Sequence, residues 1–188
     1  MTYGKLPPTA YSSVAKLLHW FVALGVLTLV PVGIVMMRIG PGPLQNNLFD
    51  FHKSLGALVL ALMILRLGYR AWHGSPQPEP SLARWQRAAS SAVHGLLYVL
   101  LFVQPLLGWA AMSAYGDRTP FFGLFSLPRI VSINRALADQ LMALHGWVGW
   151  LLALLVLMHV AAALQHYFIH RDGVLQRMLP SVLGGRKA

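Results

Sequence analysis

The chain has 188 residues, of which 56% are hydrophobic and only 11% are charged, whereas a soluble domain carries about 25% charged residues. This deficit, concentrated in long apolar runs, indicates a membrane protein. The absence of cysteine excludes disulfides, iron–sulfur clusters with thiolate ligands and covalently attached c-type haem. The net charge of +10 does not indicate nucleic-acid binding, because the basic residues lie at the ends of apolar runs, where positive charge sets membrane topology.

Four segments are apolar over the roughly 20 residues that a membrane-spanning helix needs. In chain order they cover about residues 14–37, 51–72, 88–114 and 141–168. The second connector, residues 74–80, is rich in proline and cannot continue a helix. The third connector, residues 115–140, is the longest, and we expect an interfacial amphipathic segment there. These features predict an all-α fold in which one integral membrane domain, residues 1–188, forms an antiparallel four-helix bundle.

The distribution of positive charge predicts the orientation of the bundle. Ten of the 15 Lys and Arg residues lie in the two terminal segments, in the second connector or at the helix ends beside them. The five on the opposite side are Arg38, Lys53, Arg118, Arg129 and Arg135. Because cytoplasmic loops carry the excess of cations, we expect both termini to lie in the cytoplasm. No small-residue cleavage site follows the first apolar run, so we expect no signal peptide.

Eight histidines are many for a chain of this size, and their depths are informative. His145 and His159 lie 14 residues apart on the fourth span, which places them roughly 21 Å apart along the axis and within about 40° of the same face. One helix therefore presents an imidazole in each half of the membrane. His52, at the matching end of the second span, is a partner for His145. Either His19 or His94 could be the partner of His159.

Two such pairs suit two low-spin haems, each with a neutral imidazole on both faces of the iron. A small residue follows His19, His52, His145 and His159 by four positions, on the same helix face. Such residues leave room for a flat macrocycle, although they also allow plain helix packing. They are Ala23, Gly56, Gly149 and Ala163.

The alternative interpretation of the buried histidines is a proton or metal-ion pathway. Ionisable groups within a membrane default to functional roles, and such a pathway would be expected to add intramembrane carboxylates. Every acidic residue instead lies in a connector or at a helix end: Asp50, Glu79, Asp117, Asp139 and Asp172. The sequence therefore favours haem.

Several short motifs occur in a recognisable order. They are Leu18-His19-Trp20, His52-Lys53-Ser54-Leu55-Gly56, Met158-His159 with the alanines that follow, His166-Tyr167-Phe168, Arg171-Asp172-Gly173 and Arg177-Met178-Leu179-Pro180. Together they resemble the bacterial cytochrome b561 family, and in particular its short di-haem members of the superoxide oxidase type. The resemblance covers residues 11–180.

The resemblance implies a set of ligands and contacts. The axial ligands would be His19 with His159 in the cytoplasmic half and His52 with His145 in the periplasmic half. His94 and His166 would then lie near the cytoplasmic haem, as contacts for quinone or haem propionate or as proton-transfer groups.

The resemblance also implies an activity in the bacterial inner membrane, namely oxidation of periplasmic superoxide to dioxygen with reduction of ubiquinone. An anionic substrate benefits from a cationic approach, and Lys53, beside His52, is the best single candidate for steering it. The alternative is a passive haem-bearing relay subunit of a larger membrane dehydrogenase or hydrogenase. The expected partners are the lipid bilayer, quinone and superoxide or another small periplasmic electron donor, and no nucleic acid.

Overall fold

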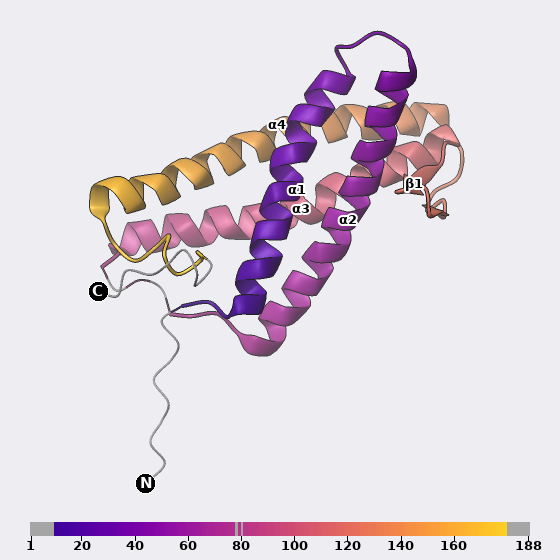
Figure 1. Ribbon diagram of the computed structural model, residues 1–188. Helices are drawn as coiled ribbons and strands as arrows, with labels where there is room; N and C mark the ends of the chain where they lie inside the picture. Colours follow the sequence, from indigo (N-terminus) through magenta and orange to yellow (C-terminus); the bar gives the residue numbers. More distant parts are fainter. Residues whose placement is uncertain (1–9, 78, 80, 180–188) are drawn as a thin grey trace.

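The computed structural model describes residues 10–77, 79 and 81–179, and long helices make up most of it (Figure 1). The helices are α1 Ser13–Met36, α2 Pro43–His73, α3 Arg84–Tyr115 and α4 Arg135–Gln165, and one π-helical turn, η1 His166–His170, follows α4. Helices α1 and α2 form one antiparallel hairpin and α3 and α4 another, and the two hairpins cross in Figure 1. Each of the four helices is long and apolar enough to cross a membrane. The prediction of an all-α, four-helix membrane fold is confirmed.

Local sequence signals define the helix ends. Ser12 caps α1 by accepting the backbone N–H of Ala15 at 3.3 Å, and Asn134 caps α4 by accepting that of Leu137 at 3.1 Å, so that N–H groups without a helical partner are satisfied. Gly116 caps the C-terminus of α3, and its φ of 81° is the left-handed conformation that glycine adopts without strain at a helix end.

Two helices begin well before the apolar runs that predict them. Helix α2 starts at Pro43 rather than near residue 51, and α4 starts at Arg135 rather than near residue 141. The helical residues that precede the apolar runs include polar side chains such as Gln45 in α2 and Asp139 in α4. Hydropathy identifies the part of a helix that lies in the hydrocarbon core of the bilayer, whereas the helix itself can extend into the interfacial region.

The connector between α3 and α4, which we expected to be an amphipathic interfacial segment, contains a β-hairpin. Strand β1, Thr119–Phe121, pairs in antiparallel fashion with β2, Phe125–Leu127. The turn between them contains Phe122 with φ 49° and Gly123 with φ 74°. The hairpin contacts α2 as well as α3, so a segment far along the chain packs against the second helix.

Each helical hairpin has its own apolar core, and shared neighbours join the two. Val22 and Val26 of α1 pack with Val59 and Met63 of α2, and Met63 is only 1% exposed. The second core joins α3 to α4 and consists of Leu97, Leu100, Leu152 and Leu155. Leu101 and Val156 pack against both cores, which fixes the two hairpins against each other near mid-height.

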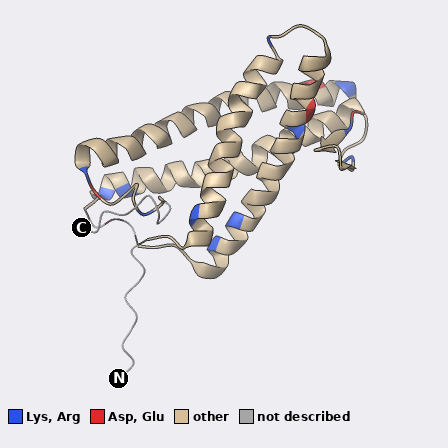
Figure 2. Cartoon of the chain, in the orientation of Figure 1, with Lys and Arg blue, Asp and Glu red and all other residues tan. Residues whose placement is uncertain are grey.

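Charged residues lie toward the helix ends and leave the middles uncharged (Figure 2). This agrees with a membrane-spanning protein, because a charged side chain at the bilayer centre is costly. Some residues that enter the orientation argument or the motifs lie outside the described residues: Lys5, Pro180, Arg186 and Lys187. The placement of both termini in the cytoplasm stays a prediction.

The C-terminal segment crosses the helix ends and ties them together. The Trp20 indole N–H of α1 donates to the Met178 carbonyl at 3.0 Å. Arg177 donates to the Gln77 carbonyl in the α2–α3 connector at 2.7 Å, and its carbonyl accepts the N–H of Tyr11 at 3.3 Å. In this way the segment links the two hairpins at the end expected to be cytoplasmic.

We expect Gly25→Ala to destabilise the α1–α2 hairpin, because a Cβ at Gly25 would lie 2.7 Å from Val59 Cγ2. Overpacking of this kind costs about 1–3 kcal/mol. The measurement is the thermal unfolding midpoint of the detergent-purified protein. In the double variant with Val59→Ala, the clash is removed and the two losses should be less than additive. Gly68→Ala is the control, since it meets nothing within 4 Å; strictly additive losses would contradict the packing described.

Candidate functional site

Four of the predicted site histidines come together in two pairs, and each pair joins α4 to a helix of the other hairpin. The ring centroids of His19 on α1 and His159 on α4 are 6.3 Å apart, with 73° between the ring planes. Those of His52 on α2 and His145 on α4 are also 6.3 Å apart, with 77° between the planes. The same geometry therefore occurs twice, at two depths along α4.

This separation matches two imidazoles on opposite sides of one metal ion. A metal–imidazole bond is about 2.0–2.1 Å long, and a ring nitrogen lies about 1.15 Å from the centroid of a ring whose bonds are about 1.35 Å long. Two rings that ligate one metal from opposite sides therefore have centroids about 6.3–6.5 Å apart. Direct stacking of two rings would bring their centroids closer than this. Two pairs held only by hydrogen bonds would have no reason to show the same centroid separation. The residues present thus fit an iron–porphyrin held by histidine on both faces.

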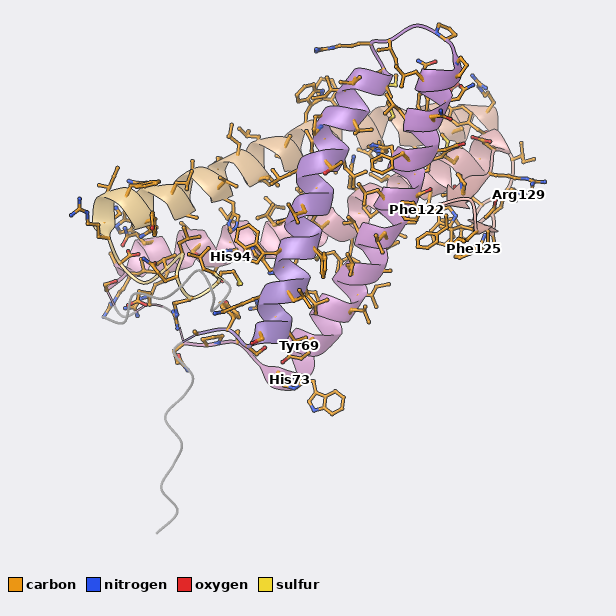
Figure 3. All side chains as sticks on the ribbon, in the orientation of Figure 1. Tyr69, His73, His94, Phe122, Phe125 and Arg129 are labelled. Carbon is orange, nitrogen blue, oxygen red and sulfur yellow. The ribbon has the colours of Figure 1, made fainter. Side chains whose placement is uncertain are left out.

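His94 lies beside His159, not across from it at the same distance. The centroids of these two rings are 5.2 Å apart, which is too short for a metal ion between them. His94 Nδ1 is instead 3.3 Å from the Ser90 hydroxyl one turn earlier on α3. Of the two partners for His159 that the sequence left open, the geometry favours His19. Figure 3 shows His94 along α3, on the side of the C-terminal segment.

A backbone hydrogen bond orients His145. Its Nδ1 lies 3.0 Å from the Gln104 carbonyl of α3, and because a carbonyl only accepts, the proton is on Nδ1. The lone pair of Nε2 is then available to a metal, as in metal-bound histidines whose second nitrogen donates to a carbonyl. The Gln104 amide donates to the His145 carbonyl at 3.0 Å and lies 3.3 Å from His145 Nε2, a contact that a metal bound at Nε2 would replace.

Glycine allows this close approach of ring and helix in both hairpins. A Cβ at Gly108, four residues after Gln104, would lie 3.1 Å from His145 Cε1. A Cβ at Gly33 of α1 would lie 3.2 Å from His52 Cε1. In each helical hairpin, therefore, a histidine ring of the second helix packs against a glycine of the first.

His52 Nδ1 is buried and forms no hydrogen bond of good geometry among the described residues, although the Leu29 backbone of α1 interacts with the ring. A buried polar nitrogen without a partner is rare and calls for an explanation, because it loses its hydrogen bonds to water. Packing does not explain the buried histidine, since an apolar side chain would fill the same space at a lower desolvation cost. A bound metal ion or cofactor would account for a histidine in this place.

The two glycines that the sequence suggested as room for a macrocycle differ in their surroundings. A Cβ at Gly56 would meet nothing within 4 Å, which keeps the space beside His52 open. A Cβ at Gly149 would lie 3.0 Å from the Gln104 amide nitrogen, so the space beside Gly149 is filled by Gln104. The sequence missed Gly33, Gly108 and Gln104 because these residues act on a histidine of the neighbouring helix.

Two arginines lie beside the His19–His159 pair. Arg66 Nη1 donates to His19 Nδ1 at 2.8 Å, and Arg66 Nε donates to the Tyr98 hydroxyl at 3.0 Å. The Arg66 and Arg70 guanidinium carbons are each 5.5 Å from the Tyr98 ring centroid. Within the part of the chain that the structure describes, neither arginine forms an ion pair. Their spacing of one turn inside an apolar run was a signal in the sequence for a site that binds an anionic group.

His166 is held at the end of α4 by an acidic partner. Its Nδ1 lies 2.5 Å from Asp172 Oδ2, and both side chains are largely buried. Asp172 Oδ1 also accepts the N–H of Val174 at 3.1 Å. His166 follows His159 by seven residues, which corresponds to roughly 10 Å along the axis and nearly the same helix face. The pair therefore lies between the inner histidines and the expected cytoplasmic surface.

Lys53 is not a freely exposed cation. Its ammonium lies 2.9 Å from Asp50 and 3.3 Å from Asp117, and the side chain is 15% exposed. It also donates to the Arg118 carbonyl at 3.3 Å. Two carboxylates neutralise its charge, so the Lys53 ammonium is engaged within the protein and is not open to an approaching anion.

Other cations line the surface at this end. A hollow of about 480 Å³ lies over the connector between α3 and α4, and Figure 3 shows Arg129 extending from this connector near Phe122 and Phe125. The hollow is lined by Gly116, Asp117, Arg118, Ser126, Leu127 and Arg129. Within the described ranges, no three His, Asp or Glu side chains are grouped so that they could hold a bare metal ion.

We expect Gly108→Ala to weaken haem binding at the His52–His145 pair, because the new methyl group would displace the His145 ring from the Gln104 carbonyl. The measurement is haem per chain in the detergent-purified protein, together with the visible spectrum. Gly95→Ala on the same helix meets nothing within 4 Å and should retain the wild-type haem content. Equal haem content in both variants would contradict the role given to Gly108.

Comparison with known proteins agrees with the histidine pattern. The Escherichia coli (strain K12) protein named Cytochrome b561 homolog 2 is 32% identical over 173 residues, which cover 92% of each chain. Cytochrome b561 homolog 1 of the same organism is 31% identical over 131 residues, 70% of this chain and 74% of that protein. The Yersinia pestis protein named Probable superoxide oxidase CybB is 28% identical over 175 residues, 93% of this chain and 98% of that protein.

A family model described as prokaryotic cytochrome b561 matches residues 10–181, which include all four long helices and both histidine pairs. The chain therefore belongs to the prokaryotic cytochrome b561 family.

Proposed function

We propose that this membrane cytochrome holds two b haems, one at each histidine pair, and transfers electrons across the membrane between them. Membership of the cytochrome b561 family implies haem b as the cofactor. The number of haems rests on one observation, the repeated 6.3 Å separation of His19 from His159 and of His52 from His145. Bound haem supplies a one-electron iron couple whose potential is set by its ligands and surroundings.

The protein's own residues provide placement and access. Each iron would have a histidine on both faces and no open coordination position, so small substrates would react by outer-sphere electron transfer. His145 and His159 on the same rigid helix keep the two sites roughly 21 Å apart along the axis. Gln104 holds His145 in one tautomer and orientation. Arg66 donates to His19 Nδ1, and this contact would have to be released for His19 to bind iron through Nε2, because a ring that accepts at Nδ1 carries its proton on Nε2.

For the reaction itself, we propose that two superoxide anions each give up one electron at the periplasmic side and leave as dioxygen. One ubiquinone takes up these two electrons and two protons to form ubiquinol. Support comes from similarity, at 28% identity, to the Yersinia pestis protein and from the cations on the expected periplasmic side. Arg118 and Arg129 line the hollow there and replace Lys53 as our candidates for steering, because the charge of Lys53 is paired.

The cytoplasmic half contains groups that suit the quinone side of the reaction. His94 lies beside His159, and the His166–Asp172 pair lies nearer the expected aqueous surface. A histidine held by a carboxylate can take a proton from water and pass it on. Arg66 and Arg70 offer donors to an anionic group, either a haem propionate or a reduced quinone.

Replacing single ligands tests the assignment. We expect His52→Ala or His145→Ala to lose one haem per chain and to keep the other, because the second pair lies at a different depth. His19→Ala or His159→Ala should lose the other haem. His94→Ala, the control, should retain both. The measurement is haem per purified chain; loss of a haem in His94→Ala with retention in His19→Ala would show that His94 is the ligand.

The proposed substrate is tested by generating superoxide enzymatically around the purified protein and following ubiquinone reduction. We expect turnover, and we expect the double variant Arg118→Gln with Arg129→Gln to be slower, most clearly at low ionic strength, where steering is least screened. Arg84→Gln, at the opposite helix end, is the matched control. A haem-loaded protein that reduces no quinone from superoxide, but co-purifies with a stoichiometric dehydrogenase or hydrogenase subunit, would support the relay function instead.

A further inference from the structure

We propose that the β-hairpin formed by residues 119–127 is a buttress that fixes the rotation of α2, and that Lys53 and Ser54 position His52 by binding this hairpin. The inference rests on the proposed function, since it concerns the histidine assigned to the periplasmic haem. It gives a role to the two residues that directly follow that histidine.

Ser54 is the centre of the contact. Its side chain is buried, with 2% exposure, and its hydroxyl oxygen accepts the N–H of Phe122 at 3.0 Å. The same oxygen lies 2.7 Å from the Asp50 carbonyl and 3.0 Å from the Pro120 carbonyl. One serine thus joins α2 to both β1 and the turn of the hairpin.

The Ser54 contact also stabilises the turn of the β-hairpin. Phe122 has a φ of 49°, in a region that residues other than glycine seldom occupy and that is costly without support. Its N–H is satisfied by Ser54 and by no strand partner, because β1 ends at Phe121. The hydroxyl therefore stabilises the one strained non-glycine residue of the hairpin.

Lys53 ties a second part of the connector to α2. Its ammonium bridges Asp50 on α2 and Asp117 just before β1, and it donates to the Arg118 carbonyl. The Lys53 side chain is 15% exposed, but the two carboxylates are 61% and 55% exposed, so solvent screens part of each ion pair. The bond to the Arg118 carbonyl adds a third contact to the same segment. Lys53 and Ser54 therefore hold adjoining segments of one connector.

These contacts surround α2 on sides that face away from His52. At about 100° per residue, Lys53 points roughly 100° and Ser54 roughly 200° from His52 around the helix. On the His52 side, the ring lies against Gly33 of α1, where an added Cβ would be only 3.2 Å away. With α1 on one side and the hairpin on the other, α2 cannot rotate without moving the His52 ring against α1 or breaking the Ser54 bonds.

The experiment is a spectroelectrochemical titration of the haem-loaded protein, with the two haems assigned through the ligand variants. We expect Ser54→Ala to keep both haems and to shift the midpoint potential of the periplasmic haem alone, with a change in its low-spin electron paramagnetic resonance signal. Ser54→Thr, which retains the hydroxyl, should keep the wild-type potential. The cytoplasmic haem is the internal reference in every sample.

The matched control is Ser113→Ala. Ser113 is also a buried serine, 1% exposed, and it binds the same connector by accepting the Ile130 N–H at 3.3 Å, but it lies on α3 and holds no part of α2. We expect it to leave the periplasmic potential unchanged. Asp117→Asn weakens the Lys53 contact from the connector without substituting a residue of α2, and it should also shift the potential of the periplasmic haem.

An unshifted periplasmic haem in both Ser54→Ala and Asp117→Asn would overturn the inference, as would an equal shift in Ser113→Ala. Equal shifts in Ser54→Ala and Ser54→Thr would overturn it too, because volume and not the hydroxyl would then be responsible. A wild-type protein that binds no haem would instead refute the proposed function, so the two failures are distinguishable.

Discussion

An imidazole buried in an apolar helix bundle loses its hydrogen bonds to water, and the four inner histidines can recover that cost only through a ligand or a protein partner. The two pairs at 6.3 Å meet this requirement if each shares one iron. The crossing of the two helical hairpins follows from the same requirement, because α4 must face α1 at one depth and α2 at another. The contact between the two helical hairpins thus serves both the apolar core and the histidine pairs.

Close approach of helices is the second condition, and glycine provides it. Gly33 and Gly108 each lie against a histidine ring of the neighbouring helix, and Gly25 lies against Val59. Without a strong hydrophobic force between helices in lipid, small residues at the contact allow the backbones to approach. The His52–His145 pair is thereby supported from α1, from α3 and, through Lys53 and Ser54, from the hairpin of the α3–α4 connector.

The sequence predicted the features that depend on spacing along one helix. Hydropathy identified the four spans, and the 14-residue interval on α4 predicted a histidine at each of two depths. It could not choose between His19 and His94, since that choice depends on the distance between helices. The early starts of α2 and α4, the β-hairpin and the ion pairs of Lys53 were missed for a related reason. Polar helix ends carry no hydropathy signal, and a connector's contacts with a distant helix leave no periodic pattern.

The two ends of the molecule differ in a way that suits directed electron transfer. One end presents Arg118 and Arg129 around a surface hollow, and the other holds Arg66, Arg70, His94 and the His166–Asp172 pair near the second histidine pair. The central claim is that both pairs ligate iron on both faces. The most direct test is electron paramagnetic resonance of the oxidised, detergent-purified protein with haem quantified per chain. We expect two low-spin ferric signals of large anisotropy, because the imidazole planes are 73° and 77° apart. A high-spin signal from either haem, or fewer than two haems per chain, would contradict ligation of both irons by histidine pairs.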